Sequence, residues 1–200
     1  MAPWGTAKLD EPPGWTARLQ LNSLAADGPA CLLALKEAGF AWHRLPDRPS
    51  TEGCALVDVV HVDAAASRFK PGFDATCALA AGLSWYQDEL QRLAEEHLRI
   101  RIKRVEHWGT YNCRNVNNAE TGRRSQHATA NAIDLAAFEL ADGRKVVVRT
   151  DWGDDTPAGR FLAAAHETAC GLFNVVLGPD YNEAHRDHFH LDLGRFRRCR

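Results

Sequence analysis

Two short segments rich in histidine and aspartate constrain the fold most strongly, because a shared site requires them to lie side by side. The first reads Ser-x-His-x6-Asp and contains His127 and Asp134, and the second reads His-x2-His-x-His and ends at His190. Two imidazoles and one carboxylate can hold zinc while leaving its fourth position open to water, as catalytic zinc sites do. Closed structural zinc sites commonly use Cys-x2-Cys pairs, which this sequence lacks. We therefore expect an open zinc site at His127, Asp134 and His190.

Length and composition indicate one globular domain. The chain has 200 residues, of which 45% are hydrophobic and 25% charged. Its formal net charge is −2, so we expect no nucleic-acid partner. The basic segment 195–200 is the local exception, and it is either a solvated terminus or a contact for an anionic polymer. No apolar run reaches the roughly 18 residues that a transmembrane helix needs, so we expect no transmembrane segment.

Six widely spaced cysteines favour two or three disulfides and therefore an oxidising compartment. The pairing stays open at this point, as does the alternative of six buried thiols in a cytosolic protein. The first residues lack a basic segment followed by an apolar one, so no signal peptide is visible. If the protein is exported, we expect that a signal preceded Met1 and was removed.

Periodicity predicts an α+β fold with a small, mainly antiparallel sheet that carries the zinc site and is flanked by helices. We expect an N-terminal arm or linker over residues 1–27, a helical and hairpin part over 28–108, and a catalytic core with the zinc site over 109–200. The expected elements are a helix over 30–39 ended by Gly39, a hairpin over 40–62, a helix capped by Asp74 that runs to about His97, a strand over 99–108, a loop over 109–126, strands over 130–140 and 145–149, a helix over 156–170, and strands over 173–177 and 188–193.

The late segment offers a spare acid or base beside the ligands. Alternate residues of a strand share a face, so His188 would point the same way as His190 if both lie on a strand. One imidazole can then bind metal while the other faces the open coordination position. Small residues at positions 128, 130 and 132 leave room for metal and substrate to approach the sheet.

These motifs resemble the zinc peptidases that cleave peptidoglycan peptides, which include D-alanyl-D-alanine carboxypeptidases and penicillin-insensitive murein endopeptidases. More closely, residues 31–200 resemble the bacterial extensin-like C-terminal domain family. The resemblance is carried by Tyr111–Arg114, Ser125–Asp134, Asp151–Trp152, Leu177–Asn182 and His185–Asp192.

The resemblance implies roles for individual residues. It makes His127, Asp134 and His190 the zinc ligands. In the murein endopeptidases the middle histidine of the late segment lies beside the zinc-bound water, which implies that His188 is the base. In the carboxypeptidases a glutamate three residues before the last zinc ligand is the base, and Asp187 occupies that position. We prefer His188, because strand alternation places it on the metal's face.

Further residues are candidates for binding substrate. The resemblance implies that Arg114 binds the substrate carbonyl or carboxylate and stabilises the oxyanion. Ser125 and His185 are further candidates for substrate contact. Ala130 departs from the pattern of the carboxypeptidases, which have glycine there, and we expect an altered local backbone.

The expected function is zinc-dependent hydrolysis of peptidoglycan stem peptides or crosslinks that contain D-amino acids, in the periplasm or cell envelope. The sequence leaves open whether the protein is an endopeptidase or a carboxypeptidase, and it leaves the oligomeric state open. The alternative is a zinc-containing cell-wall binding module, or a structural envelope protein, without hydrolytic activity.

Overall fold

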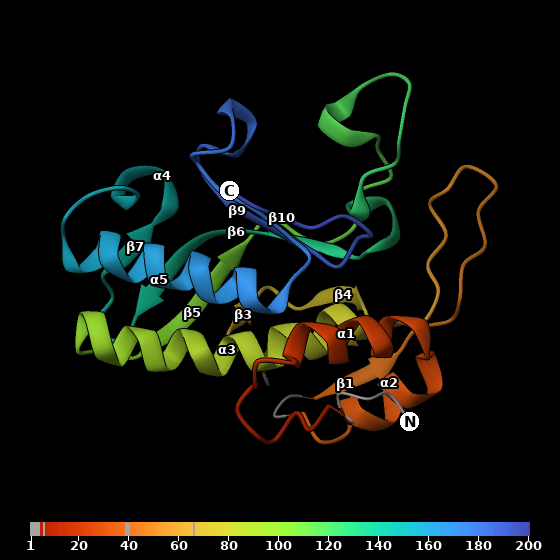
Figure 1. The fold of residues 1–200 in the computed structure, drawn as a ribbon, viewed down its shortest axis with the longest axis horizontal. Helices are drawn as coiled ribbons and strands as arrows, with labels where there is room; N and C mark the ends of the chain where they lie inside the picture. Colours follow the sequence, from red (N-terminus) through yellow and green to blue (C-terminus); the bar gives the residue numbers. More distant parts are fainter. Residues whose placement is uncertain (1–4, 6, 39–40, 66) are drawn as a thin grey trace.

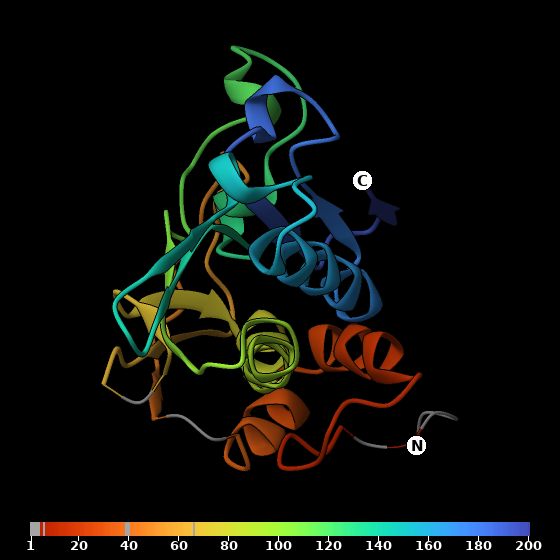
Figure 2. The same ribbon diagram turned by 90° about the vertical axis from the view of Figure 1, so that its left-hand side faces the viewer.

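Five α-helices and three short 3-10 helices lie in the described part of the chain. The computed structural model describes all residues except 1–4, 6, 39–40 and 66. The helices are α1 (Ala17–Ala26), α2 (Gly28–Leu35), α3 (Cys77–Leu98), α4 (Val148–Asp151), α5 (Pro157–Leu172), η1 (Val116–Asn118), η2 (Gln126–Thr129) and η3 (Glu183–His185). Figure 2 looks along α3, which lies between α1, α2 and α5 and is covered on its remaining side by strands of two sheets.

Ten strands form two sheets among the described residues. The strands are β1 (Trp42–Arg44), β2 (Val59–Val62), β3 (Phe69–Lys70), β4 (Phe73–Thr76), β5 (Ile102–His107), β6 (Ala132–Leu140), β7 (Lys145–Val147), β8 (Val175–Leu177), β9 (Phe189–Asp192) and β10 (Arg198–Cys199). One sheet has the antiparallel order β1-β2-β4, and the other has the order β10-β8-β9-β6-β5-β3, with β7 paired to β6. Only β3–β5 and β8–β10 run parallel. The α+β class and the mainly antiparallel sheet are therefore confirmed (Figure 1).

Helix α3 carries much of the core, because most of its first half is buried on all sides. Tyr86 is fully buried, and its hydroxyl donates a hydrogen bond to the carbonyl of Ala165 on α5. Gly82 lets Phe173 approach closely, since a Cβ at this position would lie 2.9 Å from that ring. The expected cap was wrong. Thr76 caps the helix with its side chain. Asp74 instead belongs to strand β4, and its carboxylate contacts His61, the residue opposite it on β2.

The expectation of an N-terminal arm over residues 1–27 was wrong for its second half. Residues 17–26 form α1, and Leu21 and Leu24 are buried in the main core against α3 and α5. The preceding segment is also anchored, because Trp85 on α3 donates a hydrogen bond from Nε1 to the carbonyl of Glu11. The buried residues of α1, Ala17, Leu21 and Leu24, are spaced by four and three positions, as on one face of a helix. This pattern covers too few residues to indicate a helix after a proline-rich segment.

The remaining elements follow the expectations with shifted ends. The helix expected over 30–39 ends at Leu35, and Gly39 lies outside the described residues. Strands β1 and β2 pair as the expected hairpin. A long loop over 45–58 joins them in place of a tight turn, and one isolated bridge, between Arg48 and Leu56, connects its two sides. The strand expected over 145–149 ends at Val147 and continues as α4. Strands β5 and β6 and helix α5 lie where they were expected.

Three disulfides confirm the expectation from the cysteine count. Cys31–Cys77 joins α2 to α3, Cys54–Cys113 joins the 45–58 loop to the loop after β5, and Cys170–Cys199 joins α5 to β10. All six cysteines are paired. Disulfides of this kind persist in oxidising compartments. None of the described helices is both long and apolar enough to cross a membrane.

We predict that Leu21→Ala destabilises the fold by about 2–5 kcal/mol, because the substitution leaves a cavity between α1 and the rest of the core. Thermal or denaturant unfolding measures the effect. Leu19→Ala on the same helix is the matched control, since Leu19 is 37% exposed and its loss should change stability by less than about 0.5 kcal/mol. Equal stability of the two variants would show that α1 is not part of the cooperative core.

Candidate metal centre

The pairing of β6 with β9 brings two of the predicted ligands together. The two strands are antiparallel, and Asp134 lies directly opposite His190. Residues opposite each other point to the same face of the sheet, so the carboxylate and the imidazole meet. The next pair, Ile133 and Leu191, points to the other face and is fully buried in the core.

The third predicted ligand comes from the 3-10 helix η2, immediately before β6. The Ser125 hydroxyl caps this helix by accepting a hydrogen bond from the backbone N–H of His127, at 3.3 Å. Ala130 ends the helix in the left-handed conformation, with φ +54°. Alanine therefore adopts at this position the conformation that glycine adopts most readily. The resulting turn directs the His127 side chain, which is 3% exposed, towards β6.

One atom from each of the three residues converges on a single point. His127 Nε2 lies 3.2 Å from Asp134 Oδ1 and 3.2 Å from His190 Nδ1, and His190 Nδ1 lies 3.0 Å from Asp134 Oδ1. A tetrahedral ion with bonds of about 2.0–2.1 Å separates its ligands by about 3.3 Å. The three atoms thus lie at nearly the spacing that zinc ligands require.

The outward nitrogens of both imidazoles are engaged by acceptors. His127 Nδ1 donates to the carbonyl of Thr110 at 3.1 Å, and His190 Nε2 donates to the carboxylate of Asp192 at 2.9 Å. A carbonyl only accepts, and a carboxylate normally does so, which places the imidazole protons outward and lone pairs inward. Three electron-rich atoms therefore face one another, an arrangement that needs a bound cation or an added proton.

The electrostatics of the metal-free site agree with this geometry. Burial alone would raise the pKa of Asp134, but the contacts with the imidazoles of His127 and His190 outweigh it and hold that pKa well below its usual range. Burial would lower the pKa of His190, but hydrogen bonds to Asp134 and Asp192 raise it to about 9. Without metal, the site therefore carries an ionised carboxylate beside a protonated imidazole.

His188 lies beside the three converging atoms, although it is not on a strand. Strand β9 begins at Phe189, so the strand alternation that favoured His188 does not apply. Its Nδ1 lies 3.0 Å from the Asp187 carboxylate, and its Nε2 lies 3.6 Å from Asp134 Oδ1. The Trp108 ring packs against it, with ring centroids 5.0 Å apart. Asp187 thus holds the tautomer in which the Nε2 lone pair faces the site.

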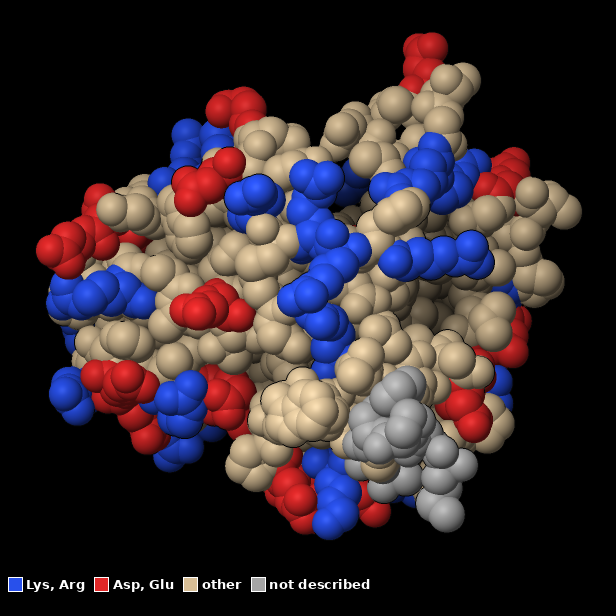
Figure 3. All heavy atoms as spheres, viewed as in Figure 1, with Lys and Arg blue, Asp and Glu red and all other residues tan. Residues whose placement is uncertain are grey.

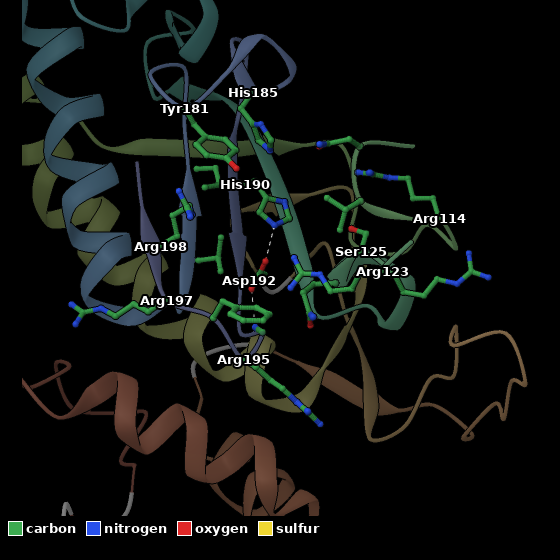
Figure 4. A pocket seen from close by; sticks show the side chains of 18 residues that line it. Arg114, Arg123, Ser125, Tyr181, His185, His190, Asp192, Arg195, Arg197 and Arg198 are labelled. Atoms are coloured by element: carbon green, nitrogen blue, oxygen red, sulfur yellow. Dashed lines mark hydrogen bonds and ion pairs between the residues drawn. The ribbon is translucent and has the colours of Figure 1, made fainter. Parts of the chain in front are cut away.

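A cavity of about 820 Å³ opens beside His190, and its lining includes Arg114, Ser125 and His185 (Figure 4). The three candidate substrate contacts are therefore brought to one cavity. His185 Nδ1 hydrogen-bonds to Asn182 Oδ1 at 2.7 Å. Burial, assisted by the charges of neighbouring histidines, lowers the pKa of His185 to about 4, so this imidazole is neutral at pH 7.

Three residues that the sequence reasoning missed shape the site. Asp192 and Thr110 hold the outward nitrogens of the ligands, and Trp108 covers His188. Asp192 could have been found, because it follows His190 by two residues and therefore shares its face of the strand. The sequence carries no signal for Thr110, since its backbone carbonyl is what binds.

A second group with possible metal ligands does not form a site. His166, Cys170 and Cys199 lie close together, but the two cysteines are joined in a disulfide. Among the described residues, the only other group close enough to hold a metal ion is His127, Asp134 and His190.

Comparison with known proteins gives one match. A family model described as extensin-like protein C-terminus matches residues 29–200. Neither curated proteins nor solved structures match the chain. The family match covers every residue of the convergent group and of the cavity beside it.

We predict that Asp192→Asn weakens zinc binding by about 10- to 100-fold, because the substitution removes the charge that orients His190 and makes it more basic. Competition titration against a chelator measures the affinity. Asp180→Asn is the matched control, since Asp180 accepts a hydrogen bond from Trp152 instead of from a ligand histidine. Equal zinc affinities of the two variants would contradict the assigned role of Asp192.

We also predict that zinc affinity rises with pH. The pKa of His190 is raised to about 9, so at lower pH a proton occupies the nitrogen that would bind zinc. This proton competes with zinc, and the competition is lost as pH rises through the pKa. Below the pKa, affinity should increase by about tenfold per pH unit, with about one proton released per zinc bound. Calorimetry in buffers of different ionisation enthalpy counts the protons. Zinc affinity that is independent of pH between about 7 and about 8 would contradict the prediction.

Proposed function

The chain belongs to the extensin-like protein C-terminus family, and from its site we propose that it is a zinc-dependent peptidase that hydrolyses D-amino-acid-containing stem peptides or crosslinks of peptidoglycan. One observation carries the proposal: three inward lone pairs of His127, Asp134 and His190 converge beside a fourth, oriented imidazole. A purely structural site would have no need of that fourth group.

The donor set supports zinc as the metal. Two imidazole nitrogens and one carboxylate oxygen suit this ion, and three protein ligands leave one position for water. When bound, zinc lowers the pKa of a water ligand to about 7 and polarises the substrate carbonyl.

His188 is suited to the role of base. With Nδ1 donating to Asp187, its Nε2 can accept the proton of the attacking water and return it to the leaving amine. Asp187 is then a positioning residue, because it holds the tautomer and stabilises the positive charge that the imidazole acquires. The two candidates for the base thus act as one unit in this proposal.

Arg114 and His185 can bind the substrate from the cavity wall. Arg114 has a permanent charge and a planar set of N–H donors, which suits a carboxylate or a developing oxyanion. His185 is neutral and holds its Nδ1 to Asn182, so its Nε2 is free to accept a hydrogen bond from a substrate amide. The cap interaction already explains the burial of Ser125, and direct contact with substrate remains a prediction.

The resemblance of the motifs to peptidoglycan-cleaving zinc peptidases supports the choice of substrate, and the three disulfides support folding outside the reducing cytosol. The periplasm or cell envelope, where peptidoglycan lies, satisfies both conditions.

We predict that the zinc-loaded protein releases peptide fragments from purified sacculi and that a chelator abolishes the release. His188→Gln should lower the rate about 10²- to 10⁴-fold, because it removes the proton acceptor. Mass spectrometry of the products identifies the bond cleaved and separates an endopeptidase from a carboxypeptidase.

Two measurements make this test decisive. Zinc content of His188→Gln should equal that of the unaltered protein, and His43→Gln, on exposed β1 away from the site, should keep full activity. A fully zinc-loaded protein that releases no product from sacculi would overturn hydrolysis and favour the alternative of a zinc-containing binding or structural module.

A further inference from the structure

Arginines dominate the wall of the cavity beside His190. The six that line it are Arg114, Arg123, Arg124, Arg195, Arg197 and Arg198. None of them forms an ion pair with a carboxylate in the described part of the chain. The only acidic residue in the lining is Asp192, which already accepts hydrogen bonds from His190 and from the backbone of Gly194. The cavity therefore has a large uncompensated positive charge. Figure 3 shows Lys and Arg side chains gathered around a hollow in the middle of this face.

The segments that carry these arginines are held in place by the fold. Segment 195–200 is no free terminus, because β10 pairs with β8 and the Cys170–Cys199 disulfide ties it to α5. The opposite wall belongs to the loop after β5, which the Cys54–Cys113 disulfide and the bridge between Asn115 and Arg124 hold. Like charges anchored in this way cannot relax by moving the backbone apart, so a bound anion would lower their mutual repulsion.

Two arginines on opposite walls have their guanidinium groups oriented by aromatic rings. Arg123 lies over the Phe196 ring at 4.8 Å from its centroid, and Arg198 lies over the Tyr181 ring at 5.7 Å. Stacking of this kind holds the plane of the guanidinium without neutralising its charge. The N–H groups at its edge stay free to bind a planar carboxylate with two hydrogen bonds.

The arginine-lined cavity is continuous with the candidate metal centre. His190, Ser125 and His185 line the same cavity, so a ligand that fills it reaches His190, one of the three residues that converge there. In Figure 4, Arg114 and Arg123 lie on the side of the loop, and Arg195, Arg197 and Arg198 lie on the side of the C-terminal segment. A volume of about 820 Å³ is within the range of small-ligand sites, which suits a short peptide segment.

We propose that this cavity binds a peptide segment with at least two free carboxylates next to the scissile amide, so that the protein selects stem peptides with free carboxylates over amidated ones. The inference rests on the proposed function and adds to it the chemical class of the substrate. The carboxylates bind the stacked guanidinium groups from both walls, while the amide lies at the metal centre.

The test uses one crosslinked stem-peptide dimer, released from sacculi, in two forms. In one form the carboxylates are free, and in the other they are converted to amides with carbodiimide and ammonia. Calorimetric titration of the metal-free protein measures binding without cleavage. We expect the free acid to bind at least about tenfold more tightly than the amide, and we expect added salt to reduce this difference.

Arg123→Gln/Arg198→Gln should abolish most of this preference while leaving zinc content unchanged. Arg48→Gln/Arg149→Gln is the matched control, because it removes the same charge, and Arg48 also stacks on a ring, that of Tyr111, without lining the cavity. Equal affinity for the acid and the amide, or a preference that survives in Arg123→Gln/Arg198→Gln, would overturn the proposal. A single-stranded oligonucleotide that binds more tightly than the acid, with the same dependence on these arginines, would also overturn it and identify a nucleic-acid site.

Digestion of the same two peptides by the zinc-loaded protein separates this proposal from the function on which it rests. Arginine-dependent preference for the acid without any cleavage would support the cavity assignment and overturn hydrolysis. Cleavage of both forms at equal rates would support hydrolysis and overturn the selection of free carboxylates.

Discussion

The antiparallel pairing of β6 with β9 is the constraint on which the rest of the site depends. It sets Asp134 opposite His190 on one face, while Ile133 and Leu191 are fully buried on the other. A shift of one residue in either strand would turn the apolar pair outward and the charged pair into the core. Because burial of an unpaired charge carries a large free-energy penalty, the shifted register is strongly disfavoured. The hydrophobic core therefore specifies how Asp134 and His190 are aligned. Packing on one face of the sheet thus determines chemistry on the other.

The same alignment makes the site depend on a cation. Asp192 and the carbonyl of Thr110 accept hydrogen bonds from the outward N–H groups of the two imidazoles, which leaves lone pairs facing the ionised Asp134. In the metal-free protein a proton on His190 relieves this convergence, which is why the pKa of that imidazole rises to about 9. A metal ion bound as proposed would compete with this proton for one position. The outward hydrogen bond that would make His190 a strong metal ligand also makes it a strong base, so a higher affinity for metal would come with a higher pKa of this imidazole.

The sequence predicted what depends on local pattern and missed what depends on distant segments meeting. Strand β6, helix α5 and the convergence of His127, Asp134 and His190 follow from periodicity and spacing. The face of His188 was argued from a strand that begins one residue later, and a turn and the Asp187 carboxylate orient it instead. The sequence predicts an arm or linker where α1 lies, because the short apolar pattern of this segment becomes a buried helix face only when α3 and α5 cover it. The arginine-lined cavity brings together residues about eighty positions apart, which β10 and two disulfides hold in place. A local sequence pattern does not predict contacts between such distant segments.

Net charge and local charge give opposite indications for this molecule, and both bear on what it can bind. The whole chain has a formal charge of −2, whereas the cavity wall combines six arginines with a single, already engaged aspartate. At about 0.1 M salt, screening limits the interaction between exposed charges to about 10 Å, so a short acidic segment inside the cavity interacts mainly with the arginines. A long polyanion extends beyond that range and meets carboxylates elsewhere on the surface, which Figure 3 shows mostly towards the edges of this face. The combination favours a compact, multiply charged ligand over an extended one, because only the compact ligand keeps all its charges within reach of the arginines.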